Sequence, residues 1–351
     1  MTKPERVTLH SSDKLGLVGS LATMLSAGIP ILDVVNSLRE DAKGGQKIIL
    51  DLLVDDLMQG KRMHQTLSKF PLVFDKVMIN VVRASEEAGT LDVTLRDLKN
   101  TIQKDIEFTD KVRSALLYPT FILIVFSLVL LMILIVVVPK ITSVFLRLRV
   151  ELPLPTKILI FLSDLVVLHT VPLIIGVVAV IGCVVLVYRH NKKILYEFLF
   201  SLPLISTLVE QIDITRFSRS LHLLLSSGLP ITAALELTKD VVVKQKTSRI
   251  IAASRDMVFA GKPLSEGFRS AKGYIPSIMI KLMEAGEKTG SLEKSMQDIS
   301  EYFDYQVTNT LKTLTALLEP VMLVFVGIVV GGMMLAIITP IYGLISQVGS
   351  Q

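Results

Sequence analysis

Cysteine and paired histidines are nearly absent from the sequence, and this narrows the chemistry available to it. The single cysteine, Cys183, lies inside an apolar run, so the chain can form no internal disulfide and no cluster of thiolate ligands. The five histidines are scattered, and none has a partner at the spacing of metal ligands. We therefore expect no metal site, and a reducing compartment is compatible with the soluble parts.

Motifs for nucleotide binding and for hydrolysis are missing as well. Gly60-Lys61-Arg62 and the tripeptide at 261–263 lack the hydroxyl residue and the upstream glycine of a phosphate loop. The sequence contains no serine-hydrolase elbow, zinc-protease motif or kinase signature. These absences predict that the chain does not hydrolyse nucleotide itself.

Charge of one sign is not concentrated in either soluble part. Residues 1–115 contain 16 lysines and arginines against 16 acidic residues, and residues 189–316 contain 17 against 13. Nucleic acid requires a concentrated basic stripe. We therefore expect no nucleic-acid partner.

Long uncharged apolar runs are the most prominent feature that is present. Hydrophobic residues make up 51% of the chain and charged residues 20%, which indicates a mixture of membrane and soluble parts. Residues 116–138 form an uncharged run that is long enough to cross a ~30 Å hydrocarbon layer. We predict transmembrane helices at 116–138, 170–188 and 317–345, with 139–169 as a loop or interfacial segment and 346–351 as a tail.

The expected orientation follows from the charged flanks and the N-terminus. Residues 1–14 have no apolar core after a basic start, so we expect no cleavable signal peptide. Basic residues precede the first span and follow the second, although the 139–169 segment is also basic. We expect residues 1–115 and 189–316 in the cytoplasm, and both 139–169 and 346–351 in the periplasm.

An internal repeat organises the chain. Residues 21–40 correspond to residues 221–240, and Ser-x-Gly-x-Pro-Ile places Gly28 and Pro30 opposite Gly228 and Pro230. Glycine suits the left-handed residue that ends a helix, and proline suits the first turn of the next helix. We call residues 1–115 repeat 1 and residues 189–316 repeat 2, and we expect two such bodies, in one chain or in two chains, to pack pseudo-symmetrically.

A second pair of turns corresponds at an offset of 201 residues. Each turn has a glycine that stops one helix, then a hydroxyl residue that suits the N-cap of the next. Two compatible roles remain open, a polar contact surface for a partner and a simple helix connection. The candidate residues are Glu86, Glu87 and Gly89 in repeat 1, and Gly286, Glu287 and Gly290 in repeat 2, where Ser85 is the counterpart of Gly286.

Helical periodicity runs through both repeats. No stretch alternates as a strand does. We predict an all-α fold with about six helices in each repeat, packed as a helical bundle. The apolar face of one helix comprises Leu15, Val18, Leu21, Ala22 and Leu25, and that of a later helix comprises Leu50, Leu53, Val54, Leu57 and Met58, with Asp51, Asp55 and Asp56 in solvent.

The repeat extends into the apolar runs. Pro119 corresponds to Pro320, and Glu319 stands where repeat 1 has Tyr118. A carboxylate near lipid is costly unless it is paired or hydrated. Glu319 is therefore either an interfacial residue hydrated by headgroup water or a buried contact within the bundle that matters to the mechanism. Gly327 and Gly331 form a Gly-x-x-x-Gly pattern that allows close helix packing in lipid.

Together these motifs resemble the inner-membrane platform proteins of type II secretion systems (the F-type protein) and of type IV pili. The resemblance covers residues 13–345. It is carried by the paired Gly-x-Pro turns, the Gly286–Leu292 turn, Tyr118-Pro119, Leu318-Glu319-Pro320 and Thr339-Pro340-Ile341. The short N-terminus is most similar to the compact members that serve type IVb or related thin pili.

The resemblance implies a non-enzymatic, multi-pass protein of the bacterial inner membrane that needs no cofactor. Its implied partners are a hexameric cytoplasmic assembly ATPase, pilin or pseudopilin subunits, other inner-membrane assembly proteins and further copies of itself, as a dimer or a tetramer. In this role the protein passes the motion of the ATPase to subunits leaving the lipid bilayer. Two other classes remain open from the residues alone, a membrane-bound signalling or assembly scaffold and, less favoured, a small transporter.

Overall fold

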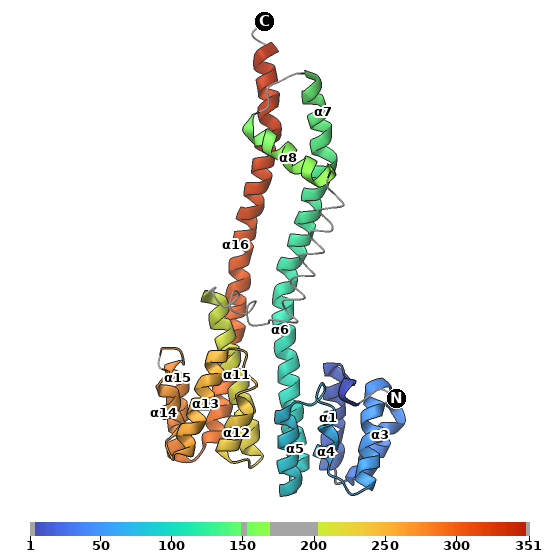
Figure 1. Ribbon diagram of the computed structural model, residues 1–351, viewed down its shortest axis with the longest axis vertical. Helices are drawn as coiled ribbons and strands as arrows, with labels where there is room; N and C mark the ends of the chain where they lie inside the picture. The colour runs from blue at the N-terminus through green and yellow to red at the C-terminus, as the bar shows by residue number, and fades with distance from the viewer. Residues whose placement is uncertain (1–3, 149–152, 169–202, 272, 349–351) are drawn as a thin grey trace. The chain divides into compact units, whose positions relative to one another are not determined.

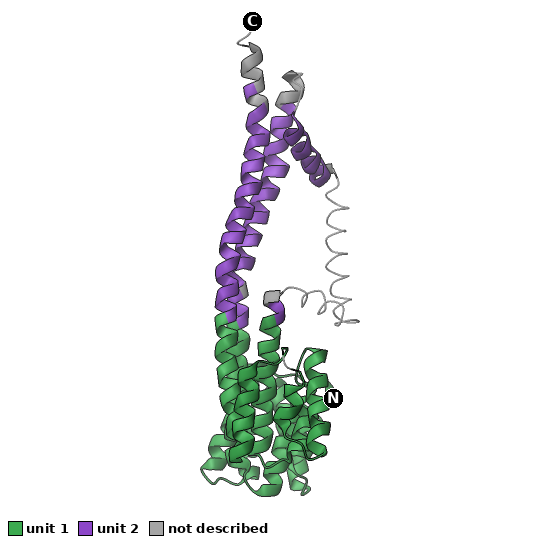
Figure 2. Cartoon of the chain, turned by 90° about the vertical axis from the view of Figure 1, so that its left-hand side faces the viewer, with its two compact units in different colours: residues 1–111, 207–309 green, residues 112–206, 310–351 purple. Residues whose placement is uncertain are grey.

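The computed structural model describes residues 4–148, 153–168, 203–271 and 273–348 (Figure 1). These residues form helices and connecting turns and include no β-strand, which confirms the predicted all-α fold. The predicted second span, residues 170–188, lies outside the described residues. The chain divides into two compact units (Figure 2): unit 1 comprises residues 1–111 and 207–309, and unit 2 comprises residues 112–206 and 310–351.

Among the described residues, each repeat contributes six helices in the same order, as the periodicity predicted. Those of repeat 1 are α1 (Ser11–Ser26), α2 (Ile31–Asp41), α3 (Gly44–Met58), α4 (Met63–Leu67), α5 (Lys76–Ala88) and α6 (Leu91–Met132). Those of repeat 2 are α11 (Pro203–Ser226), α12 (Ile231–Thr238), α13 (Gln245–Phe259), α14 (Leu264–Arg269), α15 (Ser277–Thr289) and α16 (Leu292–Val348). A short 3₁₀ turn, η1 (Pro4–Arg6), precedes α1.

Unit 1 is built around one continuous apolar core to which both repeats contribute. The predicted inner face of α1 is confirmed, because Val18, Leu21 and Ala22 are all buried. In repeat 2, Phe217 on α11 packs against Phe268 on α14 with their ring centroids 5.3 Å apart. Because the core is shared, the two repeats pack against each other within a single chain.

One helix departs from its predicted pattern near its C-terminal end. On α3, Leu53 and Val54 are buried as expected, but Met58, which was expected in the core, is 71% exposed. Asp56, expected in solvent, is only 2% exposed. Met58 is the last residue of the helix, and Asp56 is buried because cations and a hydroxyl group surround its carboxylate.

The long helices α6 and α16 run parallel within unit 1. Lys104 pairs with Glu301 at 3.3 Å and Lys111 with Asp304 at 3.8 Å, so residue numbers rise in the same direction on both helices. Both helices are long and apolar enough to cross a membrane, over Leu91–Ser143 and Leu292–Thr339, and only 11% of the most apolar window of each is buried. Such low burial is unlike that of a core helix in a soluble protein.

Unit 2 has a small core of its own. After α6 the chain passes through a π-helical segment, η2 (Ile133–Val137), into α7 (Val138–Leu148), and α8 (Leu154–Leu168) packs against both (Figure 1). The Ser163 hydroxyl donates to the carbonyl of Leu134 at 2.6 Å, inside the π-helical segment. The Thr156 hydroxyl donates to the carbonyl of Ala336 on α16, also at 2.6 Å. Within the segment predicted as loop or interfacial, α7 and α8 are therefore helical.

Candidate functional site

The glycine-proline turns end the first helix of each repeat in the same way. Gly28 and Gly228 have positive φ angles of 80° and 82°, which a residue with a Cβ adopts only with strain. In repeat 1 the amide of Ile29 donates to the carbonyl of Met24 at 3.2 Å, and the corresponding bond in repeat 2 is 3.1 Å. This is the Schellman arrangement, which satisfies carbonyls at the end of a helix.

The two prolines lie one residue earlier than predicted. Pro30 and Pro230 occupy the N-cap positions of α2 and α12, immediately before the first helical residue, with φ angles of −57° and −58°. The prediction placed them in the first turn. A fixed φ near these values suits either position, because neither requires an amide proton from the proline.

In the second pair of turns, one glutamate of each repeat forms hydrogen bonds within its own repeat. The Glu86 carboxylate accepts bonds from the amides of Met63 at 2.6 Å and His64 at 3.1 Å, and its Oε2 lies 2.6 Å from His64 Nδ1. Its side chain is 10% exposed. A carboxylate at the first amides of a helix is favourable because those amides have no helical partner and carry the positive end of the helix dipole. Glu86 therefore holds the start of α4 against the end of α5.

Glu287 does the same in repeat 2. Its carboxylate accepts bonds from the amides of Leu264 and Ser265 at the start of α14, and from the Ser265 hydroxyl at 2.5 Å. Gly89 and Gly290 follow as left-handed helix ends with φ angles of 72° and 70°. The repeated motif thus has a structural role in both repeats.

The remaining residues of this motif differ between the repeats. Glu87 is 60% exposed and lies 3.7 Å from Arg62, whereas the residue corresponding to Glu87 in repeat 2 is a lysine. A Cβ added to Gly286 would lie 2.3 Å from the Ser295 hydroxyl oxygen on α16, so α15 and α16 approach closely there. In repeat 1 the counterpart Ser85 fits, and its hydroxyl donates to the carbonyl of Val82 at 2.9 Å.

All these turns lie at one end of unit 1. Arg96, near the start of α6, donates to the hydroxyl of Ser26 at the end of α1, at 3.0 Å, and Glu86 joins the end of α5 to the start of α4. Since α6 and α16 are parallel, the corresponding turns of both repeats face the same way. We call this surface the turn end; it comprises residues 27–30, 58–62 and 86–90 of repeat 1 and residues 227–230, 259–263 and 287–291 of repeat 2.

A buried arginine joins the two repeats. Arg219 on α11 is 7% exposed. Its Nη1 lies 2.5 Å from Asp105 on α6, and its Nη2 lies 3.2 Å from Asp304 on α16. Its Nε has no hydrogen-bond partner among the described residues. Arg219 therefore connects the last helices of both repeats, and we call Arg219, Asp105 and Asp304 the inter-repeat clamp.

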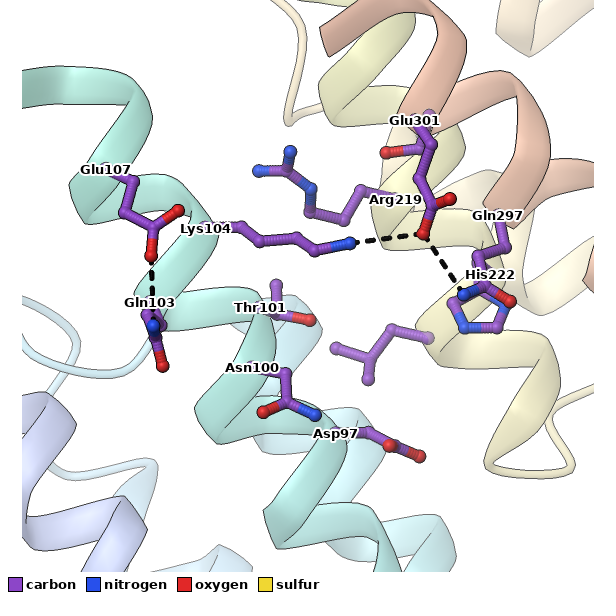
Figure 3. Close-up of a pocket in the computed structure, with 12 residues that line it drawn as sticks. Asp97, Asn100, Thr101, Gln103, Lys104, Glu107, Arg219, His222, Gln297 and Glu301 are labelled. Atoms are coloured by element: carbon purple, nitrogen blue, oxygen red, sulfur yellow. Dashed lines mark hydrogen bonds and ion pairs between the residues drawn. The ribbon is translucent and has the colours of Figure 1, made fainter. Parts of the chain in front are cut away.

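A polar groove of about 310 Å³ lies beside the clamp (Figure 3). Lys104 crosses it from α6 toward Glu301 on α16 (Figure 3). Burial raises the pKa of Asp97 in the groove wall, an effect that the nearby His222 and Arg96 partly oppose. The groove lining contains both acidic and basic side chains. Its lining includes Asp97, Asn100, Lys104, Glu107, Arg219, His222 and Glu301.

The membrane-boundary residues of both repeats meet in a second groove, which lies in unit 2. Helices α6 and α16 form this groove. Glu319 lines it from α16, and Tyr118 and the buried Pro119 line it from α6. Pro320 is exposed. The volume is about 230 Å³, and the lining is apolar apart from three side chains. We call it the Glu319 groove; it is lined by Tyr118, Pro119, Ile122, Thr315, Glu319, Met322, Leu323 and Val326.

The two glycines of the third predicted span make no close contact with other described residues. A Cβ added to Gly327 or Gly331 would meet no atom of the described chain within 4 Å. Nearby, Phe126 on α6 and Phe325 on α16 pack edge to face with their centroids 5.8 Å apart. The glycines therefore do not mark the α6–α16 contact.

The sequence patterns did not single out two of the buried charges. Arg219 follows a polar stretch of α11, and Asp56 directly follows Asp55, so neither looks different from a solvated charge. The one sequence feature that could have indicated their burial is their position on a helix face that also carries core residues. Among the described residues, no group of three or more potential metal ligands occurs.

Comparison with known proteins shows what the chain is similar to. The sequence model of the family described as type II secretion system (T2SS), protein F matches residues 17–139 and again residues 217–340. The two matches coincide with the two repeats and the apolar helices that follow them.

Curated relatives align along nearly the whole chain. The Thermus thermophilus protein named type IV pilus assembly protein PilC is 30% identical over 94% of this chain and 82% of its own length. A Pseudomonas aeruginosa protein of the same name is 29% identical over 94% of this chain and 89% of its own length. The type II secretion system protein F of Pseudomonas aeruginosa is 28% identical over 97% of this chain and 85% of its own length.

Proposed function

The chain belongs to the type II secretion system protein F family, and we propose that it is the inner-membrane platform protein of a type IV pilus or type II secretion machine. In this role it docks a cytoplasmic assembly ATPase and passes the motion of that ATPase to filament subunits. The observation that carries the proposal is the continuity of α6 and α16. Each begins at the turn end of unit 1 and continues, without a break, into an apolar segment.

The proposed topology has three membrane crossings. Two are the apolar parts of α6 and α16, whose large hydrophobic side chains are mostly exposed, and the third is residues 170–188. Both repeats lie in the cytoplasm, while residues 139–169 and 346–351 face the periplasm. The uncharged tail and the basic residues that precede the first span support this orientation.

The turn end supplies a docking surface for the ATPase. Met58 and Phe259 occupy corresponding positions as the last residues of α3 and α13, and they are 71% and 80% exposed. The repetition of a large exposed apolar side chain at the same place in both repeats gives the turn end two equivalent apolar contact points. We propose that these two side chains anchor the assembly ATPase, flanked by the polar turn residues, including Glu87.

The need for a separate motor follows from the energetics. Drawing an apolar helix out of a bilayer exposes buried surface at about 25 cal/mol per Å², which amounts to many kcal/mol for one helix. A protein that performs no catalysis supplies none of this energy, so it transmits work done elsewhere. The continuous helices α6 and α16 are suited to this task because a helix resists compression along its hydrogen-bonded axis.

Co-purification tests the docking proposal. The full chain, reconstituted in lipid nanodiscs, is mixed with the assembly ATPase of the same machine, with and without nucleotide. We expect binding, and we expect the double variant Met58→Asp and Phe259→Asp to lose it. Leu72→Asp is the matched control, since Leu72 is 64% exposed and lies between α4 and α5, away from the turn end. Equal binding by the double variant would refute docking at this surface.

Cysteine labelling tests the topology. A chain with Cys183→Ala carries a single new cysteine at position 58 or 259, both highly exposed. A membrane-impermeant maleimide should label neither position in intact cells and both positions in inverted membrane vesicles. Labelling of either position from outside intact cells would place that repeat in the periplasm and exclude the proposed function.

A further inference from the structure

The Glu319 groove contains a carboxylate that the described residues leave without a partner. No described residue lies within hydrogen-bond or ion-pair distance of the Glu319 side chain. The hydroxyl of Thr315, on the same wall, donates to the carbonyl of Leu311 at 2.9 Å instead. Tyr118 lines the opposite wall and forms no hydrogen bond with Glu319.

The backbone at this level also has surplus hydrogen-bond acceptors. Pro119 and Pro320 have no amide proton, so they cannot donate to the carbonyls of Ala115 and Ala316 four residues earlier. Both prolines lie inside helices. These two carbonyls therefore lack their usual helical donor, and Glu319 is the one charged side chain among the described residues that line the groove.

The apolar lining of the groove ranges from the buried Pro119 through the partly buried Ile122, Met322 and Val326 to an exposed rim. Leu323 is 73% exposed, and the other apolar lining residues come from two long helices whose side chains remain uncovered over most of their apolar length. A carboxylate in such surroundings is stabilised most by a partner that brings one positive charge together with an apolar surface.

We propose that the Glu319 groove binds an apolar helix that presents a single cation, an ammonium or a guanidinium group, to the Glu319 carboxylate. This inference rests on the proposed function, in which the helix belongs to a filament subunit still in the membrane. Charge complementarity favours a helix over a lipid. A zwitterionic lipid brings its phosphate close to the carboxylate together with its amine, whereas a helix with one cation brings no anion.

The groove also shows how the duplication produces one site rather than two. Tyr118 and Glu319 occupy corresponding positions of the two repeats, yet they line opposite walls of the same groove. A single acidic residue therefore serves a single cation. With glutamate at both positions, two carboxylates would share one groove, and their repulsion would favour protonation of one.

Photocrosslinking to a defined peptide tests the inference. The full chain carries a benzophenone amino acid in place of Leu323, in nanodiscs of zwitterionic lipid. The probe is a synthetic transmembrane helix of leucine and alanine with one lysine at the depth of Glu319. The matched probe has norleucine instead. We expect the lysine helix to be captured about tenfold more than the norleucine helix, because one ion pair in apolar surroundings readily supplies that factor.

Two variants assign the effect to the carboxylate. Glu319→Gln should abolish the preference for the lysine helix, and Asp164→Asn should preserve it, since Asp164 is an exposed carboxylate on α8 outside the groove. Equal capture of both helices by the unmodified chain overturns the inference. So does a preference that survives Glu319→Gln, or Glu319-dependent capture of a photoactivatable phosphatidylethanolamine without capture of the lysine helix.

ATPase co-purification from the same nanodiscs separates this inference from the proposed function. If the ATPase binds and the lysine helix shows no preference, only the groove assignment fails. If the ATPase does not bind while the lysine helix is preferred, the groove assignment stands and ATPase docking fails.

Discussion

Repeat 1 buries a charge where repeat 2 buries none. Asp56 in repeat 1 accepts bonds from Lys61 at 2.8 Å, Lys69 at 2.5 Å and Thr66 at 2.9 Å. At an offset of 201 residues, repeat 2 has Met257 in place of Asp56. The same six-helix framework therefore tolerates an ionic network or an apolar side chain at one position, provided that every buried charge has a partner.

At another pair of corresponding positions both repeats have an aspartate, and here it is repeat 2 that buries the charge. Asp13 in the first turn of α1 is exposed, whereas its counterpart Asp213 is completely buried on the longer helix α11. Asp213 accepts bonds from the amides of Val243 at 2.6 Å and Lys244 at 2.8 Å, and it thus fastens the start of α13. The two repeats share their turns but stabilise their interiors with different polar contacts, as expected if a turn restricts sequence more tightly than a core does.

The largest expected effect is the loss of the buried carboxylate of repeat 1. Asp56→Asn removes the charge that both lysines contact, and we expect the free energy of unfolding to fall by about 2 to 3 kcal/mol. Denaturant unfolding of the full chain in detergent measures it. Asp55→Asn is the control, because the adjacent Asp55 is exposed, and it should change the free energy by less than about 0.5 kcal/mol. Similar values for both variants would show that the network does not stabilise repeat 1.

The second effect is the pH dependence of the same network. Burial alone would raise the pKa of Asp56, but hydrogen bonds from Lys61, Lys69 and Thr66 outweigh burial and lower the pKa to about 2. Because the pKa in the folded state is lower than in the unfolded state, this contribution is present above pH 4 and is lost as the pH falls toward 2. It amounts to roughly 2 kcal/mol.

The test compares the unmodified chain with Asp56→Asn at pH 5 and at pH 2. The difference in unfolding free energy between the two proteins should be smaller at pH 2 than at pH 5 by most of the roughly 2 kcal/mol. Repeat 2 lacks this contribution and has one of opposite sign, since burial raises the pKa of Asp213 despite its hydrogen bonds from the amides of Val243 and Lys244. A difference that stays constant with pH would contradict the assignment to Asp56.

The third effect contrasts the α5–α6 and α15–α16 contacts. Gly286→Ala should destabilise the chain by about 1 to 3 kcal/mol, because the new Cβ would lie 2.7 Å from the Cβ of Ser295 and 3.0 Å from the Cα of Leu292. Ser85→Ala in repeat 1 should cost less than about 1.5 kcal/mol, since it removes one hydroxyl bond without adding an atom. Thermal unfolding of both variants provides the comparison, and the reverse order would exclude a closer contact in repeat 2.

The smallest expected effect concerns the left-handed glycine that ends the first helix of each repeat. Gly28→Ala and Gly228→Ala each place a Cβ on a residue with φ near 80°, and nothing else lies within 4 Å of that Cβ. Each substitution should cost about 1 kcal/mol, and the two values should agree. Gly327→Ala is a control, because Gly327 is helical and has no neighbour there either. A clear inequality between the two turns would show that their surroundings, and not the backbone angle, decide the effect.

Several features of the candidate site could be read along the chain. The glycine and proline positions, the six described helices of each repeat and the first and third apolar runs are all local patterns, and each appears among the described residues close to its predicted place. Glu86 and Glu287 were identified as candidates from the repeat alone. Their bonds to the amides that begin α4 and α14 could not be predicted, because those amides lie more than 20 residues away in sequence.

The inter-repeat clamp was beyond sequence reasoning for a similar reason. Arg219 and Asp105 are separated by 114 residues, and neither residue has a charged counterpart at the corresponding position of the other repeat, where Gly19 and Gln306 stand. A repeat predicts the contacts that both copies make. It cannot predict contacts made once, between the copies, by residues that only one copy has.

The sequence by itself determined the duplication, the all-helical fold, the turns and the apolar helices, because these depend on residues close together in the chain and on backbone angles that few residue types adopt. Only the tertiary structure decided which charges are buried, that both repeats share one core, and that Tyr118 and Glu319 line a single groove. Burial and electrostatic pairing depend on side chains brought together from distant helices, and the periodicity of one helix contains no information about its neighbours.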